Sequence, residues 1–333
     1  MNVPPASASP SLWAFESAAS TGRNLPGANS IRPVDPRALA HLDAAALSDD
    51  EFVERAYLTL LRRPVDDEAR ARAHKRLADG TLSRAAILAE LAGSDEFARL
   101  RALDDAIAAA SAGGPQRGLT APPGDERAIE IPWALGRARG ARRVLDAGSA
   151  FAEPAYLAAL LTLGADELVA VDLARVDVPG LHAVVADLRD LPFEDDSFDL
   201  ALCISTIEHV GFDNSVYGID AERDDDGIAR ALGELRRVLS AHGRLVVTVP
   251  TGAREEHGWF VQLEPEEWRT RFAAAGFDTA DEETYALGPE GWASAEDVAG
   301  ARYGKQGAGA VLCAELRPAR ADGSRSAGGQ PGR

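Results

Sequence analysis

Short runs of valine and leucine alternate with amphipathic stretches through the second half of the chain. Five such runs lie between residues 142 and 250, and residues 126–140 and 227–243 carry apolar positions at helical spacing. Two further strands are expected near residues 282–287 and 310–316. Strands that alternate with helices favour a mostly parallel sheet with helices on both faces. The pattern predicts an α/β, Rossmann-like domain with a seven-stranded, mostly parallel sheet.

The hydrophobic period differs nearer the N-terminus. From Asp49 onward, apolar residues such as Phe52 recur at three- and four-residue spacing, which is typical of amphipathic helices. Gly80 is expected to end a second helix, Ser83 to cap a third, and Gly93 to end that one. The sequence therefore predicts a small all-α module ahead of the α/β domain.

Shifts in composition divide the chain into five parts. Proline, alanine and serine dominate residues 1–45, glycine and proline interrupt residues 109–125, and residues 320–333 are small and polar. Segments of this kind bury too little apolar surface to pack. We expect a flexible N-terminal segment, a helical module over 46–108, a linker, an α/β domain over 126–319 and a disordered tail.

Charge and cysteine content narrow the partners and the compartment. The chain has 35 lysine and arginine residues and 53 aspartate and glutamate residues, a net charge of −18. Such a surface repels a phosphate backbone, so no nucleic-acid partner is expected. Cys203 and Cys313 lie inside apolar runs and are predicted to be buried thiols. With no secretory leader and no membrane span in the sequence, a cytoplasmic protein is expected.

The stretch DAGSAFAEP has the position of a nucleotide-binding loop after the first strand. Asp146 lies at the strand end, Gly148 permits a sharp turn and Ser149 follows, but Ala150 and Ala152 stand where a dinucleotide-binding loop has further glycines. A pyrophosphate would have little room. S-adenosylmethionine carries no phosphate and needs one close backbone approach, so this cofactor is predicted.

The next two strands also end in aspartates. Asp172, followed by Leu173, can accept hydrogen bonds from both hydroxyls of a ribose. Asp187, followed by Leu188, ends the third strand over the same crevice and can accept from an adenine amino group. A solvated strand end or a helix cap is the alternative for each aspartate alone, but three at successive strand ends beside a glycine turn favour a ligand site.

The segment LPFEDDSFDLALCISTIEHVG, residues 191–211, carries the most specific pattern in the chain. With VLDAGS, VAVDL and LVVTVPTG, it resembles class I S-adenosylmethionine-dependent methyltransferases, in particular a bacterial branch with STIEHVG after the fourth strand. The resemblance extends from about Arg142 to Pro318 and implies that the last strand is antiparallel. It implies cofactor contacts from the glycine loop and the following strand ends: Asp146, Gly148, Ser149, Asp172, Leu173, Asp187, Leu188, Ile204 and Ser205.

His209 and Glu208 are the candidate catalytic residues. Methyl transfer from a sulfonium requires alignment of donor and acceptor and exclusion of water, and an amine or hydroxyl acceptor must also lose a proton. His209 lies just beyond the fourth strand, and an imidazole can take that proton near neutral pH. Glu208 can orient the substrate or the cofactor. A structural role for His209, bonding a loop carbonyl, is the alternative. No metal site is predicted, because no histidine has a partner at metal-ligand spacing.

Residues of the C-terminal loops are expected to roof the crevice. Aromatic side chains with a polar edge suit a sugar ring or a flat hydrophobic acceptor, although ordinary packing explains any single one. Trp268 and Phe272, at helical spacing, are predicted to be core residues. The candidate roof residues are Tyr217, Trp259, Phe260, Gln262, Trp292 and Tyr303.

The helical module has a resemblance of its own. FVERAYLTLLRRPVD, LADGTLSR and GSDEF, over about residues 49–100, resemble a helical domain related to phycobilisome linkers that accompanies bacterial glycan-modifying enzymes. The resemblance implies a docking or scaffold role and a protein partner for this module; a packing accessory is the alternative. It also suggests a saccharide or other small-molecule acceptor, and a place in glycan biosynthesis.

Three functions remain open from the sequence. The leading hypothesis is an S-adenosylmethionine-dependent methyltransferase that acts on an O- or N-acceptor such as a glycan precursor. An NAD(P)-dependent oxidoreductase would share the layers but requires a G-x-G-x-x-G loop. A scaffold that kept the fold and lost the chemistry is suggested by Ala150, Ala152 and the helical module.

Overall fold

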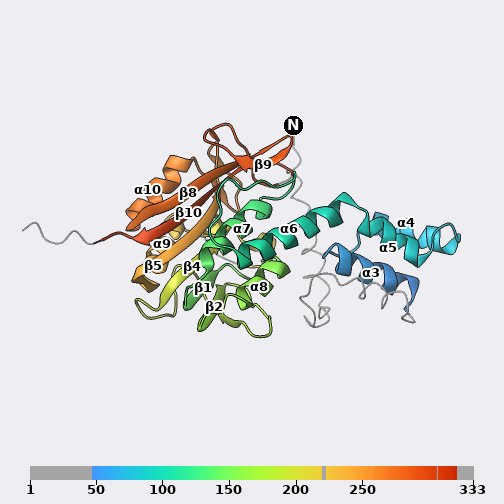
Figure 1. The fold of residues 1–333 in the computed structure, drawn as a ribbon, viewed down its shortest axis with the longest axis horizontal. Helices are drawn as coiled ribbons and strands as arrows, with labels where there is room; N and C mark the ends of the chain where they lie inside the picture. Colours follow the sequence, from blue (N-terminus) through green and yellow to red (C-terminus); the bar gives the residue numbers. More distant parts are fainter. Residues whose placement is uncertain (1–46, 220–222, 306, 321–333) are drawn as a thin grey trace, which may run out of the picture.

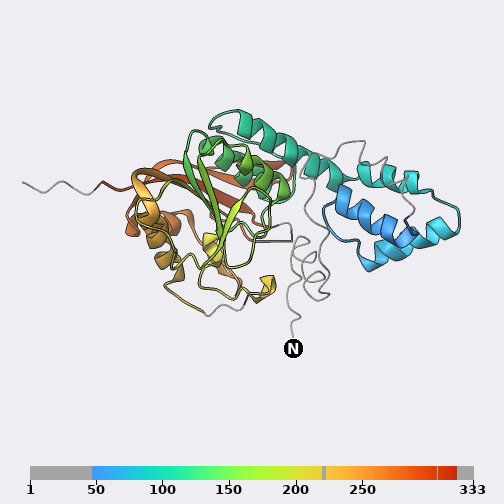
Figure 2. The ribbon, with the colours of Figure 1, turned by 90° about the horizontal axis from the view of Figure 1, so that it is seen from below.

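The computed structural model describes residues 47–219, 223–305 and 307–320. A helical module and an α/β domain lie side by side, and helix α6 (Asp95–Ala112) extends from one to the other (Figures 1 and 2). The predicted flexible N-terminal segment and all but one residue of the predicted tail lie outside the described residues. Among the described helices, none combines the length and apolar character that a bilayer crossing needs.

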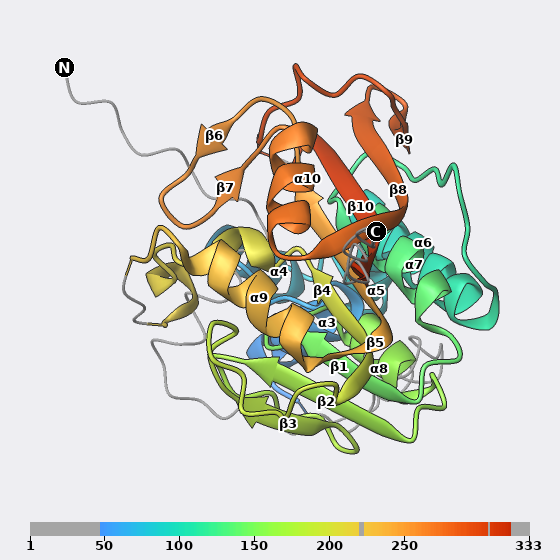
Figure 3. The same ribbon diagram turned by 90° about the vertical axis from the view of Figure 1, so that its left-hand side faces the viewer.

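The α/β domain is built on one eight-stranded sheet with the order β3-β2-β1-β4-β5-β10-β8-β9 (Figure 3). The first five strands in this order are parallel, and β10, β8 and β9 are each antiparallel to their neighbours. The strands are β1 (Arg143–Ala147), β2 (Glu167–Asp172), β3 (His182–Val185), β4 (Phe198–Ile204), β5 (Leu239–Pro250), β8 (Phe277–Gly288), β9 (Gly291–Ser294) and β10 (Ala310–Pro318). The predicted Rossmann-like fold and its antiparallel last strand are confirmed.

Alternate residues of the central strands face two separate apolar cores. Leu145 and Ala201 lie in one core, and Val144 and Leu200 lie in the other. Because side chains alternate between faces and both faces are covered, these strands appear in the sequence as continuous apolar runs. One face is covered by α6, α7 (Arg127–Ala138) and α8 (Pro154–Leu161), and the other by α9 (Gly227–Val238) and α10 (Pro265–Ala274).

Two details of the sheet differ from the prediction. The four-residue strand β9 adds an eighth strand, formed when the chain turns back at Gly288 and pairs with the end of β8. The helix predicted to reach Gly243 ends at Val238, because Leu239 already pairs with Phe198 as the first residue of β5. Apolar periodicity does not separate a helix end from a strand start when both are buried.

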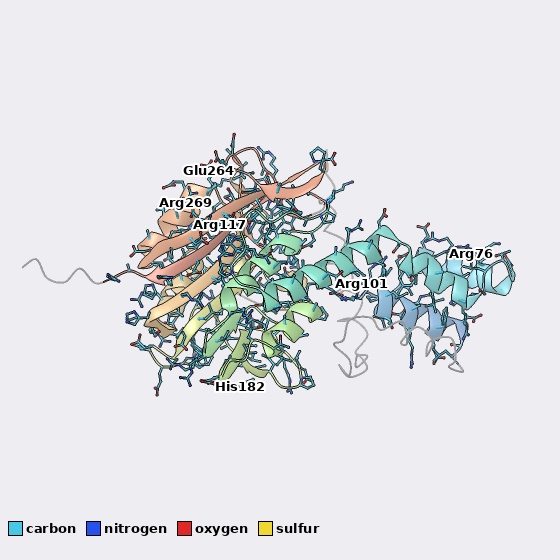
Figure 4. All side chains as sticks on the ribbon, in the orientation of Figure 1. Arg76, Arg101, Arg117, His182, Glu264 and Arg269 are labelled. Atoms are coloured by element: carbon cyan, nitrogen blue, oxygen red, sulfur yellow. The ribbon has the colours of Figure 1, made fainter. Side chains whose placement is uncertain are left out.

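The helical module consists of α3 (Asp49–Leu60), α4 (Asp67–Ala78), α5 (Arg84–Ala92) and the start of α6. Its predicted helix boundaries are confirmed: Ser83 accepts a hydrogen bond from the Ala86 N–H, Gly80 follows α4 with φ +65°, and Gly93 caps α5. The module has its own apolar core around Phe52. Figure 4 shows Arg76 at its outer end and Arg101 on α6, nearer the α/β domain. Because α6 continues past residue 108, the predicted domain boundaries stay predictions.

Candidate active site

A cavity lies at the carboxyl ends of β1, β2 and β4, where the loops after these strands converge. Parallel strands bring their carboxyl ends to one edge of the sheet, which is where ligands bind in open α/β sheets. Nine of the eleven predicted site residues line the cavity, and Ser149 and Glu208 do not. The nine are Asp146, Gly148, Asp172, Leu173, Asp187, Leu188, Ile204, Ser205 and His209.

Contacts with neighbouring strand ends fix the glycine loop. Gly148 has φ +93°, and a β-carbon at this position would lie 2.1 Å from Oγ1 of Thr206. The Gly148 N–H donates to the Val171 carbonyl at 2.9 Å, and the Ala150 N–H donates to the Asp172 carboxylate at 2.9 Å. Neither alanine of the loop adopts a positive φ. The loop therefore requires glycine at one position only, which explains why it is ordered without the later glycines.

Asp146 is buried beneath this loop, with 2% of its surface exposed. Its carboxylate accepts hydrogen bonds from the Ser149 and Tyr156 hydroxyls, both at 2.5 Å. Burial raises the pKa of Asp146 to about 6, although both bonds favour the charged form. Ser149 thus contacts Asp146 instead of the cavity. Tyr156, on α8, lines the cavity and was missed by the sequence reasoning, because its helical position is typical of a core residue.

The aspartates predicted to contact ribose and adenine have different partners. Asp172 accepts one backbone N–H on each carboxylate oxygen, from Ala150 at 2.9 Å and Ala174 at 3.0 Å, and burial raises its pKa. Asp187 pairs through both oxygens with Arg189, at 2.6 Å for the closest contact. Burial favours the neutral form of Asp187, but the Arg189 hydrogen bonds outweigh it and its pKa is lowered. Asp187 has a cationic partner, whereas Asp172 has two neutral donors.

The loop after β4 places a strained residue at the cavity edge. Ser205 has φ +46°, which is uncommon for a residue with a side chain and is found often at functional sites. Its hydroxyl donates to Oε1 of Glu208 at 3.0 Å. In η1 (Ile207–His209), Nδ1 of His209 lies 3.0 Å from the Trp259 carbonyl oxygen. Since a carbonyl can only accept, Nδ1 carries the proton and Nε2 keeps a free lone pair.

Burial favours the uncharged forms of both candidate catalytic residues. It lowers the pKa of His209 to about 4 and raises the pKa of Glu208 to about 7. Nε2 of His209 lies 3.8 Å from Oε1 of Glu208. At neutral pH, His209 is an uncharged acceptor and a weaker base than an ordinary imidazole. The carbonyl bond that its alternative, structural role requires is also present.

A second cavity lies between the α/β domain and the helical module. At its inner end, Glu126 and Arg127 at the start of α7 lie beside Glu208. The sequence reasoning missed Glu126, Arg127 and Glu130; the available signal was a charged start, ERAIE, to an otherwise apolar helix. The residues that line both cavities are Arg127, Phe151, Ala152, Glu153, Ser205, His209 and Tyr217.

Aromatic rings line the second cavity, and Tyr217 lines the first cavity as well. The expected roof is confirmed for four residues, whose successive ring centroids are 5.9, 4.5 and 4.7 Å apart: Tyr217, Trp259, Phe260 and Tyr303. The prediction is wrong for Trp292, which β9 carries into the core against α7, and for Gln262, whose amide donates to two loop carbonyls. Trp268 and Phe272 are core residues, as predicted.

Comparisons with known proteins agree with part of the sequence interpretation. Residues 145–247 match the family model of a methyltransferase domain, which confirms the methyltransferase resemblance for this part of the chain. Residues 39–101 match a domain of unknown function (DUF4214). The predicted likeness of the helical module to phycobilisome linkers is not confirmed by this match.

Individual relatives are distant. An uncharacterized protein of Methanocaldococcus jannaschii is 36% identical over 66 residues, which cover 20% of this chain and 22% of that protein. The chain thus spans about a fifth of the length of this curated relative. A solved Burkholderia thailandensis structure, 1,6-didemethyltoxoflavin-N1-methyltransferase with bound 1,6-didemethyltoxoflavin and S-adenosylhomocysteine, is 18% identical with a TM-score of 0.41, over 84% of this chain and 93% of that one. An S-adenosylmethionine dependent methyltransferase of Mesorhizobium loti is 17% identical with a TM-score of 0.40, over 56% and 97%.

Proposed function

We propose that this chain, whose residues 145–247 carry a methyltransferase domain of the S-adenosylmethionine-dependent class, transfers a methyl group from that cofactor to an oxygen or nitrogen atom of a small acceptor. The observation that carries the proposal is the convergence of the loops after β1, β2 and β4 on one cavity, with a second cavity beside it. The first cavity would hold the cofactor and the second the acceptor.

The cavity residues suit a sulfonium nucleoside better than a dinucleotide. Gly148 lets the backbone approach closely, and each oxygen of Asp172 accepts only one N–H, which leaves capacity for ribose hydroxyls. Helix α8 begins with Glu153 and Pro154, so a carboxylate and a residue without an N–H stand where a pyrophosphate would need amide donors. These features favour S-adenosylmethionine over NAD(P). When bound, it would supply an electrophilic methyl group.

The proposed contacts follow the resemblance, with one change of role. Ser149 would act through Asp146, whose carboxylate it bonds, and not by direct contact. His209 would accept a proton through Nε2 and Glu208 would orient the acceptor. The remaining proposed cofactor contacts are Asp146 and Gly148 for the amino acid moiety, Asp172 and Leu173 for the ribose, Asp187 and Leu188 for the adenine, and Ile204 and Ser205 on the far side.

A saccharide acceptor is a narrower version of this proposal. The rings of Tyr217 and Trp259, which line the second cavity, support it, because aromatic faces pack against sugar rings. The helical module forms part of the second cavity through Arg62 and Leu103, and could therefore contribute to acceptor binding. A protein partner docked on this module is proposed on the sequence resemblance alone.

Calorimetric titration of the full chain tests the proposal. S-adenosylmethionine and S-adenosylhomocysteine should each bind saturably with micromolar dissociation constants, and the reduced nicotinamide dinucleotide should not bind. No saturable heat with either adenosyl compound would contradict the proposal and favour a scaffold that retains only the fold. Saturable binding of the dinucleotide would favour the oxidoreductase.

A further inference from the structure

The inner end of the second cavity holds more buried carboxyl groups than cations. Glu126 and Glu208, which line the cavity, are 4% and 1% exposed, and Glu130, one helical turn further along α7 and not among the lining residues, is 0% exposed. Arg127 donates to Oε1 of Glu126 at 2.7 Å, and its charge favours the ionised form of all three carboxyls. One guanidinium cannot balance three carboxylates, so a shortage of positive charge exists when they are ionised.

Some of these carboxyl oxygens have nothing to bond. Among the residues that the structure describes, Oε2 of Glu208 and both carboxyl oxygens of Glu130 are buried without a hydrogen-bond partner. Buried polar atoms are almost always partnered in folded proteins, and an exception calls for an explanation such as an absent ligand. Glu208 lines the second cavity, and its unpartnered oxygen is buried in the wall of that cavity.

Two of the three other arginines around this cavity, Arg62, Arg63 and Arg99, are paired elsewhere. Arg62 forms an ion pair with Asp104 at 2.6 Å, and Arg63 forms one with Glu96 at 2.6 Å. Both arginines belong to the helical module, at the outer part of the cavity. Neither is available to compensate Glu208 without breaking a short ion pair.

Aromatic faces lie next to the free carboxyl. Trp259 stacks on His209 with ring centroids 5.0 Å apart, and Tyr217 meets Trp259 edge to face at 5.9 Å. Both rings line the second cavity together with Glu208. Tryptophan and tyrosine faces attract cations, and the attraction is greater where water is excluded.

We propose that the inner end of the second cavity binds the ammonium group of an amine, with Glu208 and Glu126 as its carboxylate partners and Trp259 and Tyr217 as its aromatic partners. This inference rests on the proposed function and narrows the acceptor atom to nitrogen. A neutral hydroxyl compound could bond the free oxygen of Glu208, but it would leave the charge shortage around Arg127 unchanged.

The same residues account for the proton that an amine must lose. An ammonium nitrogen has no lone pair and cannot accept a methyl group. Before methyl transfer one N–H bond therefore breaks, its electron pair stays on nitrogen, and the proton passes to Oε2 of Glu208. After transfer the methylated nitrogen loses a second proton, for which Nε2 of His209 is the acceptor. Burial raises the pKa of Glu208 to about 7, which makes it a stronger base than an ordinary carboxylate.

Calorimetry of the full chain at pH 8 with two probes of similar size, benzylamine and benzyl alcohol, tests the site without any cofactor. We expect saturable benzylamine binding, and at least tenfold weaker binding of the alcohol. Glu208→Gln keeps the shape and the Ser205 bond but removes the charge, so it should weaken benzylamine at least tenfold and leave the alcohol unchanged. Glu266→Gln, an exposed carboxylate on α10, is the matched control and should change neither.

Equal affinities for the two probes, or unchanged benzylamine binding in Glu208→Gln, would overturn the inference. Trp259→Leu provides a second variant, which should weaken benzylamine more than the alcohol if the ring attracts the cation. Titration of S-adenosylhomocysteine into the same protein separates the two proposals. Binding of that nucleoside without benzylamine binding sinks only the amine site, and the reverse result sinks only the proposed methyltransferase function.

Discussion

The two cavities satisfy their buried acidic groups in opposite ways. In the first, the protein itself supplies every partner: hydroxyls for Asp146, backbone N–H groups for Asp172 and Arg189 for Asp187. In the second, one oxygen of Glu208 lacks a hydrogen-bond partner among the described residues, as do both oxygens of Glu130 on the adjoining helix α7. The first cavity is therefore preorganised for a ligand, whereas the second lacks hydrogen-bond donors and positive charge that a ligand can supply.

Buried carboxyl groups thus have two different roles in this molecule: some hold loops in place, and others lack a partner that a ligand can provide. Partnered carboxylates hold loops in place, as Asp172 does for Ala150, and their hydrogen bonds offset part of the cost of burying the charge. Unpartnered carboxyls oppose folding once they ionise, and such groups persist in proteins mainly where function requires them. We therefore expect substitutions in the first cavity to reduce stability and cofactor binding together, and substitutions of the unpartnered carboxyls to leave stability unchanged or higher.

Gly148→Ala is expected to have the largest effect. The substitution forces a side chain into φ +93° and places its β-carbon 2.1 Å from Oγ1 of Thr206. Strain and overpacking together should lower the free energy of unfolding by about 2–5 kcal/mol. To relieve this contact, the loop after β1 and the loop after β4 must move apart. Saturable S-adenosylmethionine binding should therefore be lost in calorimetry, since both loops line the first cavity.

Gly164→Ala is the matched control for this variant. Gly164 also has a positive φ, +73°, but no atom lies within 4 Å of the position its β-carbon would take. It should cost only about 1–2 kcal/mol and leave cofactor binding unchanged. If both substitutions lowered the free energy of unfolding and cofactor affinity equally, the contact with Thr206 would not matter. The first cavity would then be too flexible to count as preorganised.

Asp172→Ala tests whether the partnered carboxylates also bind ligand. It removes the acceptor for the Ala150 and Ala174 N–H groups and for the expected ribose hydroxyls. Each hydrogen bond to a charged group contributes roughly 1.5–3 kcal/mol, so the calorimetric dissociation constant for S-adenosylmethionine should rise at least tenfold. An unchanged dissociation constant would refute the ribose assignment. Asp187→Ala should weaken binding less if Asp187 serves mainly as the partner of Arg189.

The first cavity was far more predictable from the sequence than the second. Asp146, Gly148 and Asp172 follow apolar runs directly, so the end of each predicted strand indicated which residues would meet at the sheet edge. Ser149 was expected to contact the cofactor, but its partner depends on a side-chain rotamer that spacing does not reveal. The strands of this sheet were also indicated by their apolar runs, apart from β9, which forms where the chain turns back at Gly288.

The second cavity depends on tertiary packing between distant segments. Glu126 and Glu130 belong to a helix whose apolar periodicity indicated only burial, and nothing local shows that α7 begins beside η1. Trp259 and Trp292 each directly follow a glycine, yet one lines the cavity and the other lies in the core. Whether an aromatic residue of a loop faces a cavity or the core depends on how the neighbouring backbone pairs. For Trp292 the deciding contact is the pairing of β9 with β8, which a single sequence does not reveal.

His209 lies between the two cavities, and two substitutions separate its alternative roles. In His209→Asn, the side-chain amide can still donate to the Trp259 carbonyl, but no equivalent of Nε2 remains; His209→Ala removes both. If Nε2 acts as a base, both variants should lower methyl transfer to an amine probe about 10–100-fold, followed as S-adenosylhomocysteine formation, with cofactor affinity unchanged. Normal turnover in His209→Asn alone would assign His209 a structural role.

The smallest expected effect concerns pH and the buried carboxyls of Glu126 and Glu130. Burial raises the pKa values of Glu126 and Glu130 to about 8, whereas in the unfolded chain both ionise near pH 4.5. The folded state therefore retains protons that unfolding releases, and the free energy of unfolding should fall as pH rises from 6.5 through about 8 and level off toward pH 9. His209, whose pKa is lowered to about 4, reduces stability only as pH falls below about 6.5, and does not interfere in this range.

Urea denaturation of Glu130→Gln across this range measures that contribution. The variant keeps the shape of the protonated carboxyl and cannot ionise, so its free energy of unfolding should fall less steeply with pH than that of the wild type, while Glu266→Gln should match the wild type. Saturating benzylamine should also flatten the wild-type curve, because a bound cation compensates Glu126 and Glu208 as they ionise. A wild-type curve with no slope between pH 6.5 and 9 would mean that these carboxyls are already compensated, and the contrast between the two cavities would disappear.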